Sequence, residues 1–488
     1  MQFNSLEFFI FFCIVVWVFF STPVRFRWLF LLIASYVFYM AWEPAYALLI
    51  ASSTVVDYAA GLLMGRAGDR SRRRKYLLMS LGANLGLLFT FKYFNFFSAA
   101  LGSFFGWLDL PFDSPYLDVL LPVGISFYTF QTLSYAIEVY RGNQEPEKHF
   151  GRFALYVSFF PQLVAGPIER PMNLLPQLRL TARFDYERIR SGLALMLWGM
   201  FKKVVVADRL AVVVDQVYGT PDRYPGMFLA IATVFFAFQI YCDFSGYSDI
   251  AIGTARVLGV DLMRNFNRPY AAESIPDFWR RWHISLSTWF RDYVYVPLGG
   301  NRVPASRWFS NIIIVFVVSG LWHGAAWTFI AWGALHGIYY ILGHASRGWR
   351  QTFARRSGLA RLPFARRGLS VACTFALVCV AWVFFRAENL RDAWYILTAI
   401  PRGWSDLSVY GGFGRIVASM DISVKALAVT ACTIPAVLSF EYLAGTRPPE
   451  QFILSQPVWV RWTVYIILCF AIMNLGVIEE IPFVYFQF

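Results

Sequence analysis

Long, continuously apolar runs recur along the whole chain, with short polar segments between them. Clear examples are residues 8–20, 28–39, 76–91, 228–241 and 464–473. Strands of an outer-membrane barrel alternate apolar and polar residues, and these runs do not. In lipid a helix satisfies its own backbone hydrogen bonds, and about 20 residues cross the hydrocarbon core. The pattern therefore predicts an all-α, polytopic membrane protein with roughly 11–13 transmembrane helices.

Two stretches in the middle of the chain depart from this pattern. Residues 159–169 combine prolines and a glycine with membrane-like hydrophobicity, which predicts a broken or re-entrant segment that lines a cavity. Residues 192–210 carry Lys202 and Lys203 near their middle. We therefore expect this second stretch to lie along the membrane interface and not to span the bilayer.

We expect one membrane-embedded domain over residues 1–488. It comprises N-terminal spans (1–118), a core that carries the chemistry (119–345), and a basic cytoplasmic loop followed by the closing spans (346–488). No internal repeat is evident, so the inverted-repeat signature of many transporters is missing.

Charge supports this class of protein. Only 15% of the residues are charged, against about 25% in soluble domains, which argues against a water-soluble fold. The net charge of +13 is concentrated in short segments such as 66–75 and 347–367, and basic loops between spans mark a cytoplasmic face. No basic and aromatic soluble module accompanies them, so we expect no nucleic-acid binding. The six cysteines lie in or beside apolar runs without a CxxC spacing, which argues against disulfides or a metal site.

Histidine is the sharpest candidate for chemistry, because its pKa near neutrality suits proton transfer. His323 lies in the sequence Gly-Leu-Trp-His-Gly (320–324), inside the apolar run 311–329. An ionisable residue at such a position indicates function by default, and flanking glycines allow a backbone or ligand to approach closely. A buried structural histidine is the alternative.

His283 lies in Phe-Trp-Arg-Arg-Trp-His-Ile-Ser-Leu-Ser (278–287). Guanidinium groups and indoles beside an imidazole can bind a flat, anionic ligand through charge and stacking. The alternative is an aromatic and basic belt at the membrane interface. His336 follows His323 by 13 residues, which is about 220° of net rotation on a continuous helix, so we assign it only a supporting role.

Other site classes find little support. Asp243 and Asp249 are six residues apart and do not share a helix face, so we expect separate ion pairs with arginines and not a paired-carboxylate site. The sequence has no Walker A motif, no GxSxG elbow and no HExxH zinc motif. We expect no bound metal and no bound cofactor.

Five stretches together resemble the membrane-bound O-acyltransferase family. They are residues 122–135 (PVGISFYTFQTLSY), 159–170 (FFPQLVAGPIER), 243–251 (DFSGYSDIA), 278–302, and 320–337 (GLWHGAAWTFIAWGALHG). Within the family the chain resembles the bacterial branch that contains alginate O-acetyltransferase and the D-alanyl transfer protein of teichoic acid synthesis. The likeness runs from about residue 40 to residue 345, with a weaker echo in Tyr485-Phe486-Gln487-Phe488.

The resemblance implies a multi-span enzyme with a central tunnel, in which a thioester donor enters from the cytoplasm and the acceptor arrives from the outer side. Its two hallmark histidines fall on His283 and His323, with His323 the essential one. The stretch RRWHISLSTWFRDY is more similar to the alginate type than to the D-alanyl type. Members of the alginate type act with periplasmic acetyltransferases of SGNH-hydrolase-like fold, which finish the transfer onto an exopolysaccharide.

These observations combine into one hypothesis for the site. His323 acts as general base toward an acceptor hydroxyl, and His283 orients the thioester carbonyl or helps to hold the acceptor. Arg280, Arg281 and Trp282 meet the phosphates and adenine of acetyl-CoA, or bind another acyl thioester donor. The further residues expected to contact substrate or donor are Trp279, Ser285 and Trp322.

The predicted function is O-acetylation of an exopolysaccharide such as alginate, by a multi-pass protein of the bacterial inner membrane that works with periplasmic partner proteins. Three alternatives stay open. A polysaccharide transporter would also use arginines and intramembrane histidines, a scaffold of a synthase complex would need neither histidine, and D-alanyl-type transfer to a cell-wall polymer would use the same site.

Overall fold

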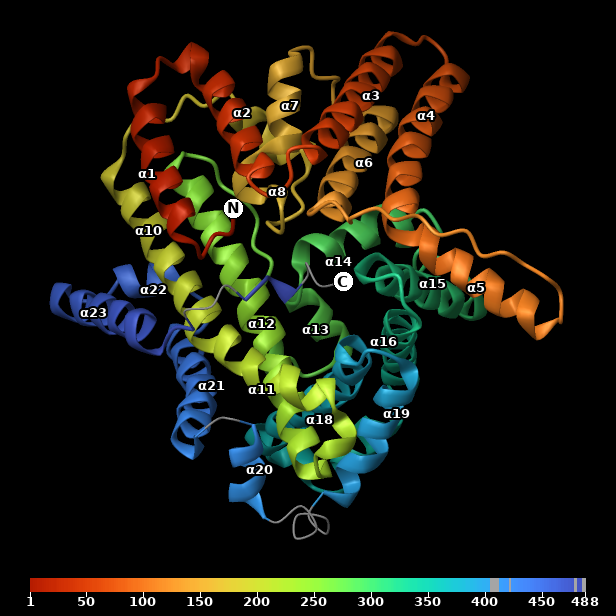
Figure 1. Ribbon diagram of the computed structural model, residues 1–488, viewed down its shortest axis with the longest axis vertical. Coiled ribbons are helices and arrows are strands. Elements are labelled where there is room, and N and C mark those ends of the chain that lie inside the picture. The colour runs from red at the N-terminus through yellow and green to blue at the C-terminus, as the bar shows by residue number, and fades with distance from the viewer. Residues whose placement is uncertain (404–411, 421–422, 478–480, 485–488) are drawn as a thin grey trace. The chain divides into compact units, whose positions relative to one another are not determined.

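The computed structural model describes residues 1–403, 412–420, 423–477 and 481–484 (Figure 1). Regular structure among these residues is helical, with no strand, and the prediction of an all-α protein is confirmed. The C-terminal Tyr485–Phe488, part of the resemblance noted above, lies outside the described residues.

The chain divides into two compact units. The first comprises Met1–Met196 and Tyr247–Met263, and the second comprises Leu197–Gly246 and the chain from Arg264 onward. The chain passes from one unit to the other within α10 (Tyr186–Met200) and again within α12 (Gly226–Val257). The predicted division at residues 118 and 345 does not coincide with these units and stays a prediction.

The first unit is built from short and medium helices. Its helices are α1 (Leu6–Ser21), α2 (Val24–Met40), α3 (Tyr46–Arg66), α4 (Arg70–Leu88), the π-helical turn η1 (Phe89–Tyr93), α5 (Phe94–Trp107), α6 (Ile125–Arg141), α7 (Phe150–Ser158), α8 (Phe160–Leu163) and α9 (Pro171–Gln177). The predicted break at residues 159–169 is confirmed, since α8 ends after four residues and irregular backbone follows.

The second unit holds the remaining helices. They are η2 (Phe201–Ala207), α11 (Asp208–Gly219), η3 (Pro221–Arg223), η4 (Pro269–Ala271), α13 (Ile275–Arg281), α14 (Ile284–Phe290), η5 (Arg291–Tyr295), α15 (Ala305–His323), α16 (Trp327–Ala345), α17 (Arg347–Arg356), η6 (Leu359–Arg361), α18 (Pro363–Arg386), α19 (Leu390–Ala399), η7 (Ile400–Arg402), α20 (Phe413–Ser419), α21 (Val424–Ala444), α22 (Pro449–Leu454) and α23 (Val458–Leu475). The basic stretch after α16 was expected to be a loop, but it forms α17, because arginine, glutamine and alanine favour a helix.

Seven helical stretches of the described chain are long and apolar enough to cross a membrane. They are α3, α4 with α5, α12, α15, α18, α21 and α23. The prediction of a multi-pass membrane protein is confirmed, and the finer count of roughly 11–13 spans stays a prediction.

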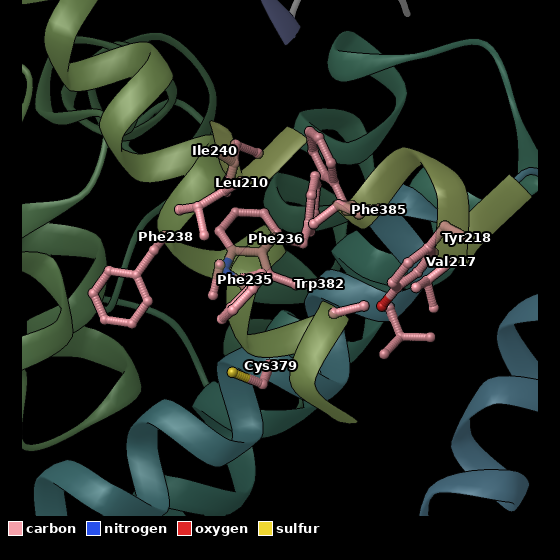
Figure 2. Packing of buried hydrophobic residues seen from close by; sticks show 14 of the residues in the cluster. Leu210, Val217, Tyr218, Phe235, Phe236, Phe238, Ile240, Cys379, Trp382 and Phe385 are labelled. Carbon is pink, nitrogen blue, oxygen red and sulfur yellow. The ribbon is translucent and has the colours of Figure 1, made fainter. Parts of the chain in front are cut away.

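The core of the second unit is aromatic. Phe235, Phe236 and Phe238 of α12 pack with Trp382 and Phe385 of α18, and α11 contributes aliphatic side chains to the same cluster (Figure 2). The rings of Phe236 and Trp382 meet edge to face with centroids 6.3 Å apart. This cluster supports the helices that carry the histidines.

Helices α15 and α16 form a tight hairpin whose closest approach depends on glycine (Figure 1). A Cβ at Gly320 would lie 2.2 Å from the carbonyl oxygen of Phe329, and a Cβ at Gly333 would lie 2.2 Å from that of Phe316. Small residues of this kind let two helix backbones approach in a membrane protein. The hairpin fixes the position of His323, the last residue of α15.

Candidate active site

His283 lies at a tight turn between two short helices. Ser274 caps α13 by accepting a hydrogen bond from the backbone N–H of Asp277, and the helix ends at Arg281. His283 has φ 42° and ψ 55°, the left-handed region, which residues with a Cβ rarely adopt. Its side chain is 0% exposed.

Burial determines the charge of His283. Desolvation lowers the pKa of this imidazole to about 3, because burial disfavours the charged form. The ring is therefore neutral at physiological pH, with one nitrogen able to donate and the other able to accept a hydrogen bond. A neutral imidazole suits contact with an uncharged carbonyl or hydroxyl better than binding of a phosphate.

His323 lies at the break between α15 and α16. The ring centroids of Trp332 and Phe385 lie 5.0 and 5.4 Å from the centroid of its imidazole, and the side chain is 3% exposed. Gly324 follows, where a Cβ would lie 2.1 Å from the ring of Phe329, so the chain turns closely around an aromatic side chain. The glycine after His323 thus has the close-packing role that the sequence indicated.

Trp322 connects the two histidines. Its ring centroid lies 4.9 Å from that of His323 and 6.0 Å from that of His283. Phe244 meets the other imidazole edge to face, with its ring centroid 4.6 Å from that of His283. The structure therefore brings both predicted histidines into one buried, aromatic site, although they are 40 residues apart in sequence.

His336 lies on a different helix from His323. The argument for opposite faces assumed one continuous helix, and the chain instead breaks after His323 and turns back as α16. As a result the indole of Trp332 lies between the two, with ring centroids 5.0 Å from His323 and 5.1 Å from His336. His336 is fully buried, and its Nδ1 accepts a 3.3 Å hydrogen bond from the indole N–H of Trp279.

The residues expected to bind the donor occupy different surroundings. Arg280 is exposed, and Arg281 donates a 3.0 Å hydrogen bond to the carboxylate of Asp277. Trp282 is 1% exposed and packs in the aromatic core, with ring centroids 5.4 Å from Phe278 and 5.0 Å from Trp382. This packing favours a core role for Trp282 over stacking on a nucleobase.

The side chain of Ser285 is enclosed by protein. It is fully buried, and its hydroxyl donates a 2.6 Å hydrogen bond to the side-chain oxygen of Asn265. Asn265 is a residue that sequence reasoning missed. The sequence indicated Asn265 only indirectly. Helix α14 begins after a Trp-His pair and not after one of the usual capping residues, so its first N–H groups need an acceptor from elsewhere in the chain.

Comparisons with known proteins fit this geometry. Residues 147–382, which include both histidines, match the model of the membrane-bound O-acyltransferase family. A protein of Azotobacter vinelandii named "Probable alginate O-acetylase AlgI" is 35% identical over 515 residues, with 100% of each chain covered. The chain belongs to the membrane-bound O-acyltransferase family.

Two further relatives extend the comparison. The protein with the same name in Pseudomonas aeruginosa is 40% identical over 82% of this chain and 75% of its own length. A peptidoglycan O-acetyltransferase of Helicobacter pylori is 37% identical over 76% of this chain and 72% of its own length. The resemblance found in the motifs is confirmed, and the chain is an O-acyltransferase.

This O-acyltransferase also buries a cluster of charges that the sequence did not predict. The ammonium group of Lys203, on η2, lies 2.7 Å from the carboxylate of Asp208 and 2.8 Å from that of Asp243. Asp243 was expected to pair with an arginine, and it pairs with this lysine. Lys202 and Lys203 are both buried, because the second unit supplies partners for them, and the location of residues 192–210 along the membrane interface stays a prediction.

The same cluster holds part of the C-terminal segment. Lys203 donates a 3.1 Å hydrogen bond to the carbonyl oxygen of Ile481, and Asp243 accepts a 2.7 Å hydrogen bond from the N–H of Val484. Between them, the ring of Phe483 lies 5.6 Å from that of Phe244, which itself contacts His283. Among the described residues, no three His, Cys, Asp or Glu side chains gather closely enough to hold a metal ion.

Proposed function

We propose that the chain acetylates an exopolysaccharide such as alginate, with an acetyl thioester as donor and His323 as general base. The observation that carries the proposal is the pair His283 and His323, buried together around Trp322 in a member of an O-acyltransferase family. The names of the relatives from Azotobacter vinelandii and Pseudomonas aeruginosa support acetyl as the group and alginate as a candidate acceptor.

The chemistry follows from the imidazole of His323, which lies at the end of α15. His323 takes the proton of the acceptor hydroxyl while the hydroxyl oxygen attacks the carbonyl carbon of the thioester. The carbon–sulfur bond then breaks, and the leaving thiolate receives the proton from His323. Proton transfer of this kind contributes about 10²- to 10⁴-fold in rate. His283, held neutral by burial, donates a hydrogen bond to the thioester carbonyl or holds the acceptor.

Acetyl-CoA is the proposed donor, and Arg280 with Arg281 is the proposed site for its phosphates. Arg280 is the better candidate of the two for binding phosphate, because it is exposed, whereas Arg281 already pairs with Asp277. The proposed setting is the bacterial inner membrane, with acetyl groups passed to the polymer directly or through a periplasmic acetyltransferase of SGNH-hydrolase-like fold.

The test is the acetyl content of the polymer in a strain that lacks its own gene and is complemented with wild type, His323→Ala or His283→Ala at equal membrane levels. We expect His323→Ala to leave polymer yield unchanged and to remove its acetyl groups. Loss of the polymer itself would favour the transporter. Normal acetylation with His323→Ala would overturn the mechanism and favour a scaffold.

A further inference from the structure

The backbone of His283 is held in an unfavourable conformation, and something must stabilise it. Its φ of 42° places it in the left-handed region, where the Cβ of an ordinary residue crowds the carbonyl oxygen. Strained residues of this kind persist only when the surrounding structure over-determines them. A group in contact with the turn must therefore hold His283 in this conformation.

That group is Asn265. Its side-chain oxygen accepts two hydrogen bonds from Ser285, at 3.3 Å from the backbone N–H and 2.6 Å from the hydroxyl. Its backbone carbonyl oxygen accepts a 2.9 Å hydrogen bond from the N–H of Ile284. Asn265 thus binds both residues that follow His283, and it is almost fully buried.

A second hydrogen bond secures the other side of the turn. The N–H of Asn267 donates a 3.0 Å hydrogen bond to the carbonyl oxygen of Arg281. The short segment from Asn265 to Asn267 therefore holds the chain both before and after His283. The chain changes direction at His283, whose backbone adopts the left-handed conformation.

The contrast with His149 shows what this arrangement achieves. His149 precedes α7 with an extended backbone, and its own Nδ1 accepts a hydrogen bond from the N–H of Arg152. That imidazole is used to cap its helix. His283 occupies the same position before α14, yet its side chain makes no capping hydrogen bond, because Asn265 accepts from the first N–H groups of α14 instead.

We propose that Asn265 is a positioning residue for acyl transfer, which replaces His283 as the cap of α14 and so directs the imidazole to the site around Trp322. The inference rests on the proposed function, since it needs His283 to act in the reaction. Asn265 acts through Ser285 and the backbone and touches no reacting atom.

The experiment compares variants of the full chain in the complemented strain, with polymer acetylation measured per amount of folded protein in the membrane. Asn265→Ala removes the acceptor and should reduce acetylation by at least about tenfold, within the range that a misplaced catalytic group costs. Asn265→Asp keeps an oxygen that accepts from Ser285 and should restore most of the activity. Asn265→Leu fills the same space without an acceptor and should behave as Asn265→Ala does.

Asn267→Ala is the matched control. Its side chain is exposed, and the hydrogen bond that it makes to Arg281 comes from the backbone, so the variant should acetylate as wild type does. Equal activity of Asn265→Leu and Asn265→Asp per folded protein would overturn the proposal, because a packing role alone predicts that result.

A thermal-stability measurement keeps the inference falsifiable if the activity of Asn265→Ala is too low to measure. Glycine adopts the left-handed conformation without strain, so the melting temperature lost through Asn265→Ala should be smaller in a His283→Gly background. Equal losses in the two backgrounds would overturn the positioning role. Normal acetylation with His283→Ala would instead refute the role that the proposed function gives to His283, and would leave the hydrogen-bond coupling standing.

Discussion

The histidine site and the Lys203 cluster bury titratable groups in opposite ways. Around Lys203 each charge faces an opposite charge, with carboxylates 2.7 and 2.8 Å away. His283 and His323 lie against aromatic rings, at centroid distances from 4.6 to 6.0 Å. A charge is stabilised by the first environment and a neutral imidazole by the second. The difference separates a cluster that holds the fold together from one that suits proton transfer.

The largest expected effect is the loss of stability on breaking the Lys203 cluster. Lys203→Met removes one member of a buried ion cluster and leaves two carboxylates facing each other, which costs about 3–5 kcal/mol of stability. We expect little folded protein in the membrane, measured by its melting temperature and yield after detergent extraction. A stable Lys203→Met protein that has lost only its activity would place the lysine in the chemistry instead.

The next effect concerns the hairpin that positions His323. Gly333→Ala brings a Cβ to 2.2 Å from the carbonyl oxygen of Phe316 and should destabilise the protein by about 1–3 kcal/mol. Gly343→Ala, on the same helix, meets open space and is the control. Equal melting temperatures for the two variants would show that the hairpin is not closely packed at this point.

A smaller effect follows from the neutral state of His283. Burial lowers the pKa of this histidine to about 3 from its usual 6.5, so the unfolded chain binds a proton between those pH values and the folded chain does not. Stability should fall as pH decreases from about 6.5, by up to about 1.4 kcal/mol per pH unit for one proton. His283→Gln should show a shallower dependence of melting temperature on pH. An unchanged slope would mean that His283 is not buried in its neutral form.

The smallest effect concerns the two arginines proposed for the donor. Arg280→Gln should raise the half-saturating acetyl-CoA concentration a few-fold, which corresponds to a surface charge interaction on the order of 1 kcal/mol. Arg281→Gln should change it less, because its charge is paired with Asp277. The reverse order would assign the phosphates to Arg281.

The sequence was informative where the relevant residues are neighbours along the chain. The glycines around His323 and the break at residues 159–169 are local features, and the structure has both. The burial of Lys203 could not be predicted in this way, because its partner Asp243 lies 40 residues further on and the ion pair forms only in the folded unit.

Long-range contacts explain the other omissions. Asn265 lies in irregular backbone 18 residues before His283, and no periodic pattern connects the two. The rotation argument for His336 and His323 does not apply, because it held only for one continuous helix and the chain forms a hairpin. Beside two arginines, Trp282 was predicted to stack on the adenine of the donor. Its packing against Trp382 is a contact that forms only in the tertiary fold.

The most direct test of the account is acyl transfer itself. Membranes that contain equal amounts of folded wild type or His323→Gln would be supplied with radiolabelled acetyl-CoA on the cytoplasmic side, and label in the exopolysaccharide would be measured. The account predicts a loss of about 10²-fold or more for His323→Gln, the share of catalysis that a general base supplies. Transfer within a few-fold of wild type, at equal melting temperature, would contradict it.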